Sequence, residues 1–191
     1  NFNGIGGSTV LYSGHFPRLH PSDFKVKNVD NVSFNWPISY NELEQYYEMN
    51  EKIVGIHGLG DDPAYPKIKN LRSPINLGKS GELISRAFKK LNWHCWPSYS
   101  AINTQNNFSV KTVYDKYFPL IKKSKNITIK KNLEVVKILS DEKKVKGVLC
   151  YDQKKNALRF NSQLVILACN GIGTPRLLLN SKNKYFKNGI A

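Results

Sequence analysis

The chain has 191 residues, of which 40% are apolar, and this is enough to build the hydrophobic core of one domain. Its longest unbroken apolar run, Leu164–Cys169, has six residues, whereas a membrane-spanning helix needs about 20. The composition therefore excludes a wholly disordered chain and predicts no transmembrane segment. The cysteines are odd in number and widely spaced, which predicts neither a disulfide framework nor a metal clip and favours a reducing, cytoplasmic compartment. They are Cys95, Cys150 and Cys169.

The formal net charge of +15 at pH 7 would ordinarily indicate a nucleic acid or an anionic surface as partner. Lysine supplies 24 of the 29 basic residues, and arginine supplies only 5. Because arginine is the better bidentate ligand of phosphates and base edges, this balance argues against a dedicated nucleic-acid role. We expect no specific nucleic-acid partner and interpret the lysines as a solvated surface.

The first two thirds of the chain are predicted to be mixed in structure. Residues 1 to 24 are Gly-rich and then aromatic, without a helical period, which indicates a loop-like segment. Ser39 and Glu42 have the spacing of a capping box, and the helix that they begin is expected to end at Gly55. A second amphipathic helix is predicted over Glu82–Leu91.

From about residue 116 the pattern becomes β-rich. Extended runs at 127–129, 133–139, 145–151 and about 157–160, separated by polar turns, predict an antiparallel meander. Residues 164–169 are apolar at every position, which is typical of a strand buried on both faces of a parallel sheet.

A glycine turn and a helix follow that strand. Gly171 and Gly173 are expected to form the turn, with Thr174 as the N-cap and Pro175 as the first residue of a helix that ends near Ser181. Together these elements predict an α/β fold, mixed with α+β features, in which a nucleotide-binding framework carries an inserted region.

Two glycine turns are candidate phosphate sites. At the junction of strand, turn and helix that contains Gly171, unpaired amides and the helix dipole favour an anion. The turn Gly6–Thr9 also offers backbone amides, with two hydroxyl groups beside them. Either turn can equally be a tight connection between packed elements, and the residues alone leave both interpretations open.

Four stretches of the chain, in this order, resemble the glucose-methanol-choline (GMC) oxidoreductases, a family of FAD-dependent flavoproteins. The resemblance implies an incomplete FAD-binding, Rossmann-like domain with an antiparallel β-meander and part of an inserted substrate or cap domain. It assigns residues 1–24 to the flavin loop, 25–115 to the substrate or cap region, and 116–191 to the return into the FAD-binding domain. The matching stretches are residues 4–9, 16–24, 36–47 and 167–181.

The resemblance also implies where the cofactor binds. The turn Gly6–Thr9 corresponds to the loop along the flavin and pyrophosphate, and Tyr12 and Ser13 lie near the isoalloxazine ring. The backbone of Val135 faces the adenine, and residues 168–171 lie near the ribose and pyrophosphate. The implied cofactor-binding residues are Gly6, Gly7, Ser8, Thr9, Tyr12, Ser13, Val135, Ala168, Cys169 and Gly171.

Departures from the family pattern refine these expectations. The first βαβ unit with its dinucleotide motif is expected before Asn1, and the catalytic histidine is expected after Ala191, so we assign no catalytic residue here. Leu11 stands where some members attach the flavin through a histidine, which favours noncovalent FAD. Cys169 is expected to be a small buried filler rather than a redox thiol. Residues 103–113 look shorter than in relatives, which could alter a lid over the substrate.

No histidine is assigned as a catalyst, and no metal site is expected, because the four histidines are too scattered for a zinc constellation. They are predicted to be packed or surface residues: His15, His20, His57 and His94.

By resemblance, the function is oxidation of a CH–OH group of an alcohol, sugar or choline-like small molecule, with hydride transfer to flavin N5. By this interpretation the chain is an internal fragment that is inactive alone. The substrate and the electron acceptor are left open. Two alternatives are kept: a catalytically dead basic binding module on the same scaffold, and a nonfunctional remnant.

Overall fold

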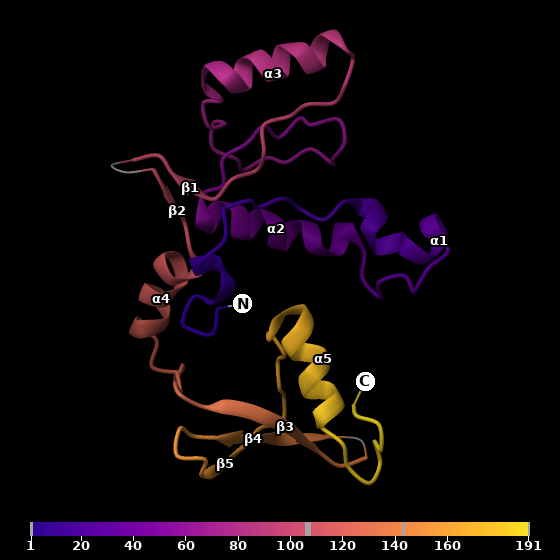
Figure 1. Ribbon diagram of the computed structural model, residues 1–191, viewed down its shortest axis with the longest axis vertical. Helices are drawn as coiled ribbons and strands as arrows, with labels where there is room; N and C mark the ends of the chain where they lie inside the picture. Colours follow the sequence, from indigo (N-terminus) through magenta and orange to yellow (C-terminus); the bar gives the residue numbers. More distant parts are fainter. Residues whose placement is uncertain (1, 106–107, 143, 191) are drawn as a thin grey trace. The chain divides into compact units, whose positions relative to one another are not determined.

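The structure is a computed structural model that describes residues 2–105, 108–142 and 144–190. It divides into two compact units, Asn1–Ile127 (unit 1) and Thr128–Ala191 (unit 2). Figure 1 shows the elements of both units in chain order. Unit 1 contains the short 3-10 helices η1 (Gly7–Val10) and η2 (Pro21–Lys25), the helices α1 (Val26–Asp30), α2 (Tyr40–Val54), α3 (Gly78–Lys90) and α4 (Val113–Lys123), and the strands β1 (Ile102–Asn103) and β2 (Ser109–Val110). Unit 2 contains β3 (Glu134–Ser140), β4 (Val145–Tyr151), β5 (Ala157–Asn161) and α5 (Asn170–Asn180).

The core of unit 1 lies where extended segments meet the end of α2. His57 and Ser100 exchange two backbone hydrogen bonds of 2.9 Å, and the amide of Arg72 donates to Ile56 O at 2.7 Å. These links bring together segments that are far apart in the sequence and satisfy their backbone groups without a long strand. The side chains buried between them are Val54, Ile56, Ile68, Tyr99 and Ala101.

Helix α2 confirms the prediction made from its ends. Ser39 is the N-cap, its hydroxyl accepts from the amide of Glu42, and the Glu42 carboxylate accepts from the amide of Ser39. The hydrogen bonds from Ser39 also lower the pKa of Glu42. Gly55 ends the helix with φ of 73°, a left-handed conformation that glycine adopts without steric cost.

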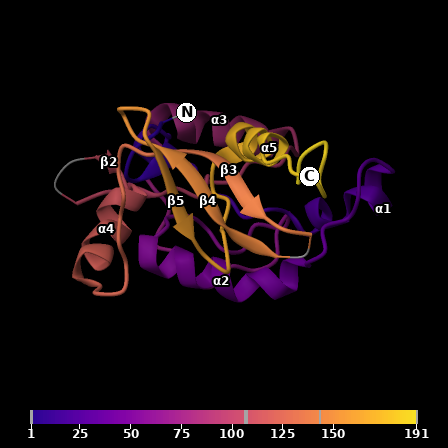
Figure 2. The ribbon, with the colours of Figure 1, turned by 90° about the horizontal axis from the view of Figure 1, so that it is seen from below.

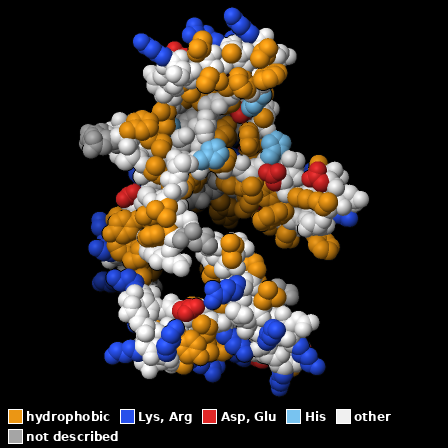
Figure 3. All heavy atoms as spheres, viewed as in Figure 1, with side chains coloured by type: hydrophobic (Ala, Val, Ile, Leu, Met, Phe, Trp, Pro, Cys, Tyr) orange, Lys and Arg blue, Asp and Glu red, His pale blue; other side chains and the backbone are white. Residues whose placement is uncertain are grey.

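Helix α3 begins at Gly78, four residues before the predicted start, and has no buried residue. Its apolar face is largely exposed, with Leu83 and Ile84 on the helix and Leu91 just beyond it. Figure 3 shows hydrophobic side chains gathered on this helix beside Lys and Arg side chains.

Helix α4 was not among the predicted elements. Thr112 and Asp115 form a capping box at its start, and Pro119 lies inside it. Between β1 and β2, which pair antiparallel, residues 106 and 107 lie outside the described residues, so the predicted shortening of 103–113 is described only in part.

The predicted antiparallel meander is confirmed in unit 2, where the strand order is β3–β4–β5. The run 127–129, predicted as extended, forms no strand. Gly147 has φ of 140°, and a Cβ there would lie 1.9 Å from Phe160 O, so β4 and β5 approach more closely than a side chain would permit. In Figure 2 the three strands lie side by side.

Helix α5 packs on β3 through Leu177 and the fully buried Ser181 at its C-terminal end. The Ser181 hydroxyl donates to Leu177 O at 2.6 Å and accepts from the amide of Ile138 at 2.8 Å. One serine thus satisfies a backbone amide of β3, which is an edge strand of the sheet.

The expectation of a doubly buried parallel strand at 164–169 is wrong for the described residues. The segment forms no strand, and Leu164 and Ile166 are 73% and 82% exposed. The described strands of unit 2 pair only with each other, so no neighbouring parallel strand is present to cover this segment. Cys169, expected to be buried, is exposed for the same reason.

The predicted start of the last helix is also wrong. Helix α5 begins at Asn170, so Thr174 and Pro175 lie inside it and Gly171 and Gly173 belong to its first turn. The Asn170 side-chain oxygen accepts from the amides of Ile172 and Gly173 at 2.9 and 3.1 Å. An asparagine can therefore cap this helix before the threonine is reached.

Among the described residues, no helix combines the length and the apolar character needed to cross a membrane.

Candidate functional site

The turn Gly6–Thr9 is built around two left-handed glycines, with φ of 100° at Gly6 and 57° at Gly7. The amide of Gly7 donates to Gly4 O at 3.0 Å. A Cβ on Gly6 would lie 2.8 Å from Val10 Cγ2, whereas a Cβ on Gly7 would meet nothing within 4 Å. One glycine is therefore packed inward, and the backbone of the other is open to a ligand.

The two hydroxyl groups of this turn differ. Ser8 is exposed. The Thr9 hydroxyl already makes two hydrogen bonds within the protein. It donates to Gly6 O at 2.6 Å and accepts from the amide of Val113 at 3.0 Å. Only the Ser8 hydroxyl is therefore available to a ligand without breaking these internal bonds.

Tyr12 and Ser13 are the residues expected near the flavin ring. One of the two side chains is engaged inside the protein and the other is exposed. Tyr12 packs against the core of unit 1, and its hydroxyl donates to Lys111 O at 2.6 Å. Burial raises the pKa of this phenol. Ser13 is exposed. The Tyr12 side chain thus packs against the core, and Ser13 lies at the surface.

Lys111 is a buried lysine that the sequence did not single out. It is 5% exposed, and its ammonium donates to Gly55 O at the end of α2. Burial lowers the pKa of Lys111 to about 8, with further contributions from Arg72 and Lys116. Among the described residues, no acidic side chain forms an ion pair with Lys111. An acceptor at a helix C-terminus is favourable for a cation.

The remaining candidates lie in unit 2. Val135 is on β3, partly exposed, and pairs with Cys150 of β4. Ala168 is exposed like Cys169, and a Cβ on Gly171 would meet nothing within 4 Å. The backbone at Gly171 is therefore as open as that at Gly7.

Asn170 was missed by the sequence reasoning, although it occupies the amides that the prediction left free for a phosphate. Its side chain takes the amides of Ile172 and Gly173, as described above, and its own φ is 63°. The missed signal is an asparagine directly before a glycine at a helix start, because an asparagine side chain can accept from the first amides of a helix.

The structure gathers the candidates within each unit. Gly6, Gly7, Ser8, Thr9, Tyr12 and Ser13 lie in one segment of unit 1. In unit 2, Arg176 of α5 lies 3.5 Å from Glu134, the neighbour of Val135, so the strand bearing Val135 runs beside the helix bearing Gly171.

The histidines have structural partners. His15 Nδ1 lies 2.8 Å from Ser98 Oγ, and His57 Nδ1 lies 2.8 Å from Ser73 O. His94 Nε2 lies 2.8 Å from the buried Asp62 carboxylate, with the ring stacked on a tryptophan. His20 caps η2 and contacts Ala64 O.

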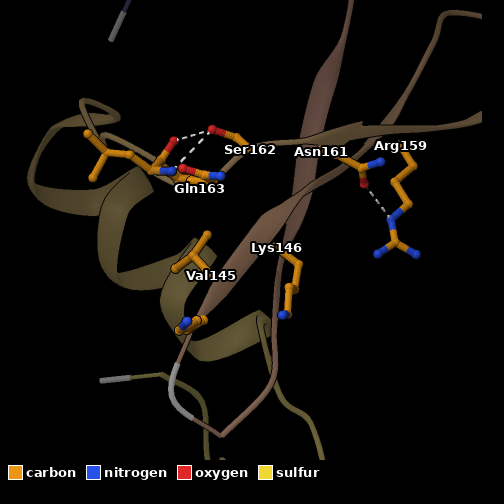
Figure 4. Close-up of a pocket in the computed structure, with 9 residues that line it drawn as sticks. Val145, Lys146, Arg159, Asn161, Ser162 and Gln163 are labelled. Atoms are coloured by element: carbon orange, nitrogen blue, oxygen red, sulfur yellow. Dashed lines mark hydrogen bonds between the residues drawn. The ribbon is translucent and has the colours of Figure 1, made fainter.

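A basic hollow on unit 2 lies apart from the candidate residues. Figure 4 shows Lys146 and Arg159 on one side of it and Gln163 on the other. Arg159 Nε donates to the side chain of Asn161 at 3.1 Å, and Lys146 pairs with Asp141 at 2.9 Å. None of the residues predicted to bind the cofactor lines this hollow. Its lining is Lys144, Val145, Lys146, Arg159, Asn161, Ser162, Gln163, Leu164 and Val165.

Comparison with known proteins identifies the family. The family model described as GMC oxidoreductase matches residues 2–184. The chain is similar to 2-methyl-1,2-propanediol dehydrogenase of Mycolicibacterium austroafricanum, with 33% identity over 99% of the chain and 38% of that protein. It is also similar to 6'''-hydroxyparomomycin C oxidase of Streptomyces lividus, with 26% identity over 97% of the chain and 39% of the relative. The fructose dehydrogenase large subunit of Gluconobacter japonicus is 26% identical over 98% of the chain and 38% of its own length.

The chain therefore spans about two fifths of the length of these relatives. The alternatives of a basic binding module and a nonfunctional remnant are not favoured by these matches. Because the family match includes both glycine segments and extends over nearly the whole sequence, the chain belongs to the GMC oxidoreductases.

Proposed function

We propose that this chain is part of an FAD-dependent oxidoreductase that oxidises a CH–OH group of a small-molecule alcohol or sugar. The observation that carries the proposal is the family match over residues 2–184. The names of the relatives point to hydroxyl-bearing small molecules, since they include a diol dehydrogenase and a fructose dehydrogenase. No specific nucleic-acid partner is part of the proposal, and we propose a reducing, cytoplasmic location for a protein whose three cysteines are free.

The residues present fit a dinucleotide cofactor at two places. Gly7 and Gly171 both leave the space around their backbone open, as is required where a backbone approaches a phosphate closely. Ser8 and Ser13 are exposed and offer hydroxyl groups to FAD beside the first of these glycines. At the second, Asn170 occupies the amides of Ile172 and Gly173, so the proposed site there rests on the open backbone at Gly171 and on the dipole of the first turn of α5.

Binding without a covalent link is part of the proposal. Leu11, at the position where a histidine would attach the flavin, has an exposed aliphatic side chain that can form no such bond. Bound FAD would supply the redox chemistry by accepting hydride from the substrate carbon at N5. The proposed role of unit 1 is to offer the open backbone at Gly7 to the cofactor. For unit 2, considered by itself, the proposed contacts are Val135 and residues 168–171.

The test is to produce the protein from its complete reading frame and to examine it for bound flavin. We expect a yellow protein that loses its flavin on acid precipitation, because noncovalent FAD is released, and that reduces a dye when an alcohol or sugar is added. A protein that neither contains flavin nor takes up added FAD would overturn the proposal. Flavin that stays with the precipitated polypeptide would overturn noncovalent binding alone.

A further inference from the structure

The Gly6–Thr9 turn is hydrogen-bonded to the start of α4, although more than a hundred residues separate the two in the sequence. Figure 1 shows the N-terminal turn beside the first turn of α4. The Thr9 hydroxyl donates to Gly6 O at 2.6 Å and accepts from the amide of Val113 at 3.0 Å. A single hydroxyl group therefore holds the carbonyl of the glycine turn and an amide of the helix at once.

The amide of Val113 donates to Thr9, while the local cap of α4 serves other amides. The first amides of a helix have no partner inside the helix. In the α4 capping box, Thr112 accepts from the amide of Asp115 at 3.1 Å, and Asp115 accepts from the amide of Thr112 at 3.1 Å. Both cap acceptors are thus engaged with other amides, and Val113, the first residue of α4, finds its acceptor in Thr9.

Direct packing strengthens this link. A Cβ on Gly6 would lie 3.0 Å from Tyr114 Cβ and 3.4 Å from the Tyr114 backbone nitrogen. A second hydrogen bond holds the other end of the turn, since the Tyr12 hydroxyl donates to Lys111 O at 2.6 Å. The segment from Gly6 to Tyr12 is therefore fixed at two points to residues 111–113, and between them a Cβ on Gly7 would meet nothing within 4 Å.

We propose that Thr9 is a positioning residue for the cofactor and not a ligand of it. Its hydroxyl proton is donated to Gly6 O and its oxygen accepts from Val113, so the side chain acts through the backbone of the turn. Through this hydroxyl, α4 holds Gly6 and Gly7 in the left-handed conformation that leaves the Gly7 backbone open. The inference rests on the proposed function, because it concerns how the same turn receives FAD.

The experiment compares Thr9→Val, which keeps the shape of the side chain and removes the hydroxyl, with Thr9→Ser, which keeps the hydroxyl. FAD is titrated into the apoprotein of the complete reading frame, and hydrogen exchange of the Val113 amide is measured with and without FAD. We expect Thr9→Val to bind FAD about tenfold more weakly, because part of the binding free energy must then be spent on ordering the turn that Thr9 holds in place. The Val113 amide should exchange faster in this variant even without FAD, and Thr9→Ser should restore both properties. The control Thr104→Val alters an exposed threonine of unit 1 and should change neither.

The outcomes separate this inference from the proposed function. Failure of the unaltered protein to take up FAD overturns both. Uptake of FAD with equal affinity by the unaltered protein and Thr9→Val overturns the positioning role alone. If Thr9→Val does not fold, Tyr12→Phe removes the second attachment while keeping the ring in the core, and it is expected to weaken FAD binding several-fold. Unchanged FAD affinity in Tyr12→Phe would then count against the proposal.

Discussion

Arg18 and Glu51 form a buried ion pair through two hydrogen bonds, from Nε to Oε1 at 2.6 Å and from Nη2 to Oε2 at 2.7 Å. The remaining side of the guanidinium donates to the Tyr40 hydroxyl at 2.8 Å. Both partners of the pair are 3% exposed. The pair joins the segment that follows the Gly6–Thr9 turn to helix α2. The position of that segment therefore depends on a guanidinium that is buried away from solvent.

Removing one partner of this pair should destabilise the protein more than removing both. Burial acts to lower the pKa of Arg18, but hydrogen bonds to Glu51 and Tyr40 raise it above its ordinary value, so the guanidinium stays charged. In Glu51→Gln this charge is buried without compensation, and we expect a loss of about 3–5 kcal/mol of unfolding free energy. The double change Arg18→Met with Glu51→Leu should cost clearly less. Urea unfolding of the three proteins measures the difference, and equal costs would contradict the role of the charge.

The stability of the protein should depend on Lys111 at alkaline pH. Burial, with Arg72 and Lys116 nearby, lowers the pKa of Lys111 from 10.5 to about 8. Between these values the unfolded chain binds the proton and the folded protein does not, so the unfolding free energy rises with pH across this window. Below about pH 8 both states are protonated, and the cost of the buried ammonium is present in full.

Lys111→Met should remove this rise. Cys150 and the buried tyrosines, whose pKa values burial raises, act in the opposite direction, but they are the same in both proteins. The unfolding free energy of the two proteins should therefore be compared from about pH 7 to about pH 10. Parallel profiles across this range would show that Lys111 does not titrate in the folded state as proposed.

Ser181→Ala should destabilise unit 2 although it removes a single oxygen atom. The amide of Ile138 would be left buried without an acceptor, which costs about 1–3 kcal/mol. Ser162→Ala, at an exposed serine of the same unit, should change the unfolding free energy by less than about 0.5 kcal/mol. Thermal and urea unfolding give both values, and similar results for the two serines would contradict the importance of the Ile138 bond.

Two glycines of unit 2 should respond to alanine in opposite ways. Gly147→Ala would place a methyl group 1.9 Å from Phe160 O and should separate β4 from β5, lowering the melting temperature. Gly171→Ala meets no atom and replaces a helical glycine, which should stabilise α5 by about 0.5–1 kcal/mol. If FAD approaches this backbone as proposed, Gly171→Ala should also bind FAD more weakly. Unchanged FAD affinity in this variant would remove Gly171 from the cofactor site.

The elements that could be predicted from the sequence are those with local determinants. Ser39, Glu42 and Gly55 fix both ends of α2, and alternating polarity and turns fix the meander, so both were predicted with small boundary errors. Helix α4 has the same kind of cap in Thr112 and Asp115. It was missed because Pro119 is a strong signal against a helix, although helices tolerate proline at a local cost.

The features that could not be predicted depend on distant partners. The apolar run 164–169 has the composition of a buried strand, but burial requires a neighbour that the described residues do not supply. Helix α5 begins before Thr174 because the Asn170 side chain already accepts from the amides of Ile172 and Gly173, and an asparagine tolerates the left-handed conformation that Asn170 adopts. The role of Thr9 depends on a contact with Val113 that no local pattern reveals.

The strand order of unit 2 has a consequence for how the protein acquires its structure. Each strand of β3–β4–β5 pairs with the next one along the chain, so only short loops have to close before the pairing contributes free energy. Such a meander can assemble as successive hairpins while synthesis is still in progress. In unit 1, by contrast, the attachment of Thr9 to Val113 cannot form until more than a hundred further residues have been made, so the glycine turn acquires its final shape late.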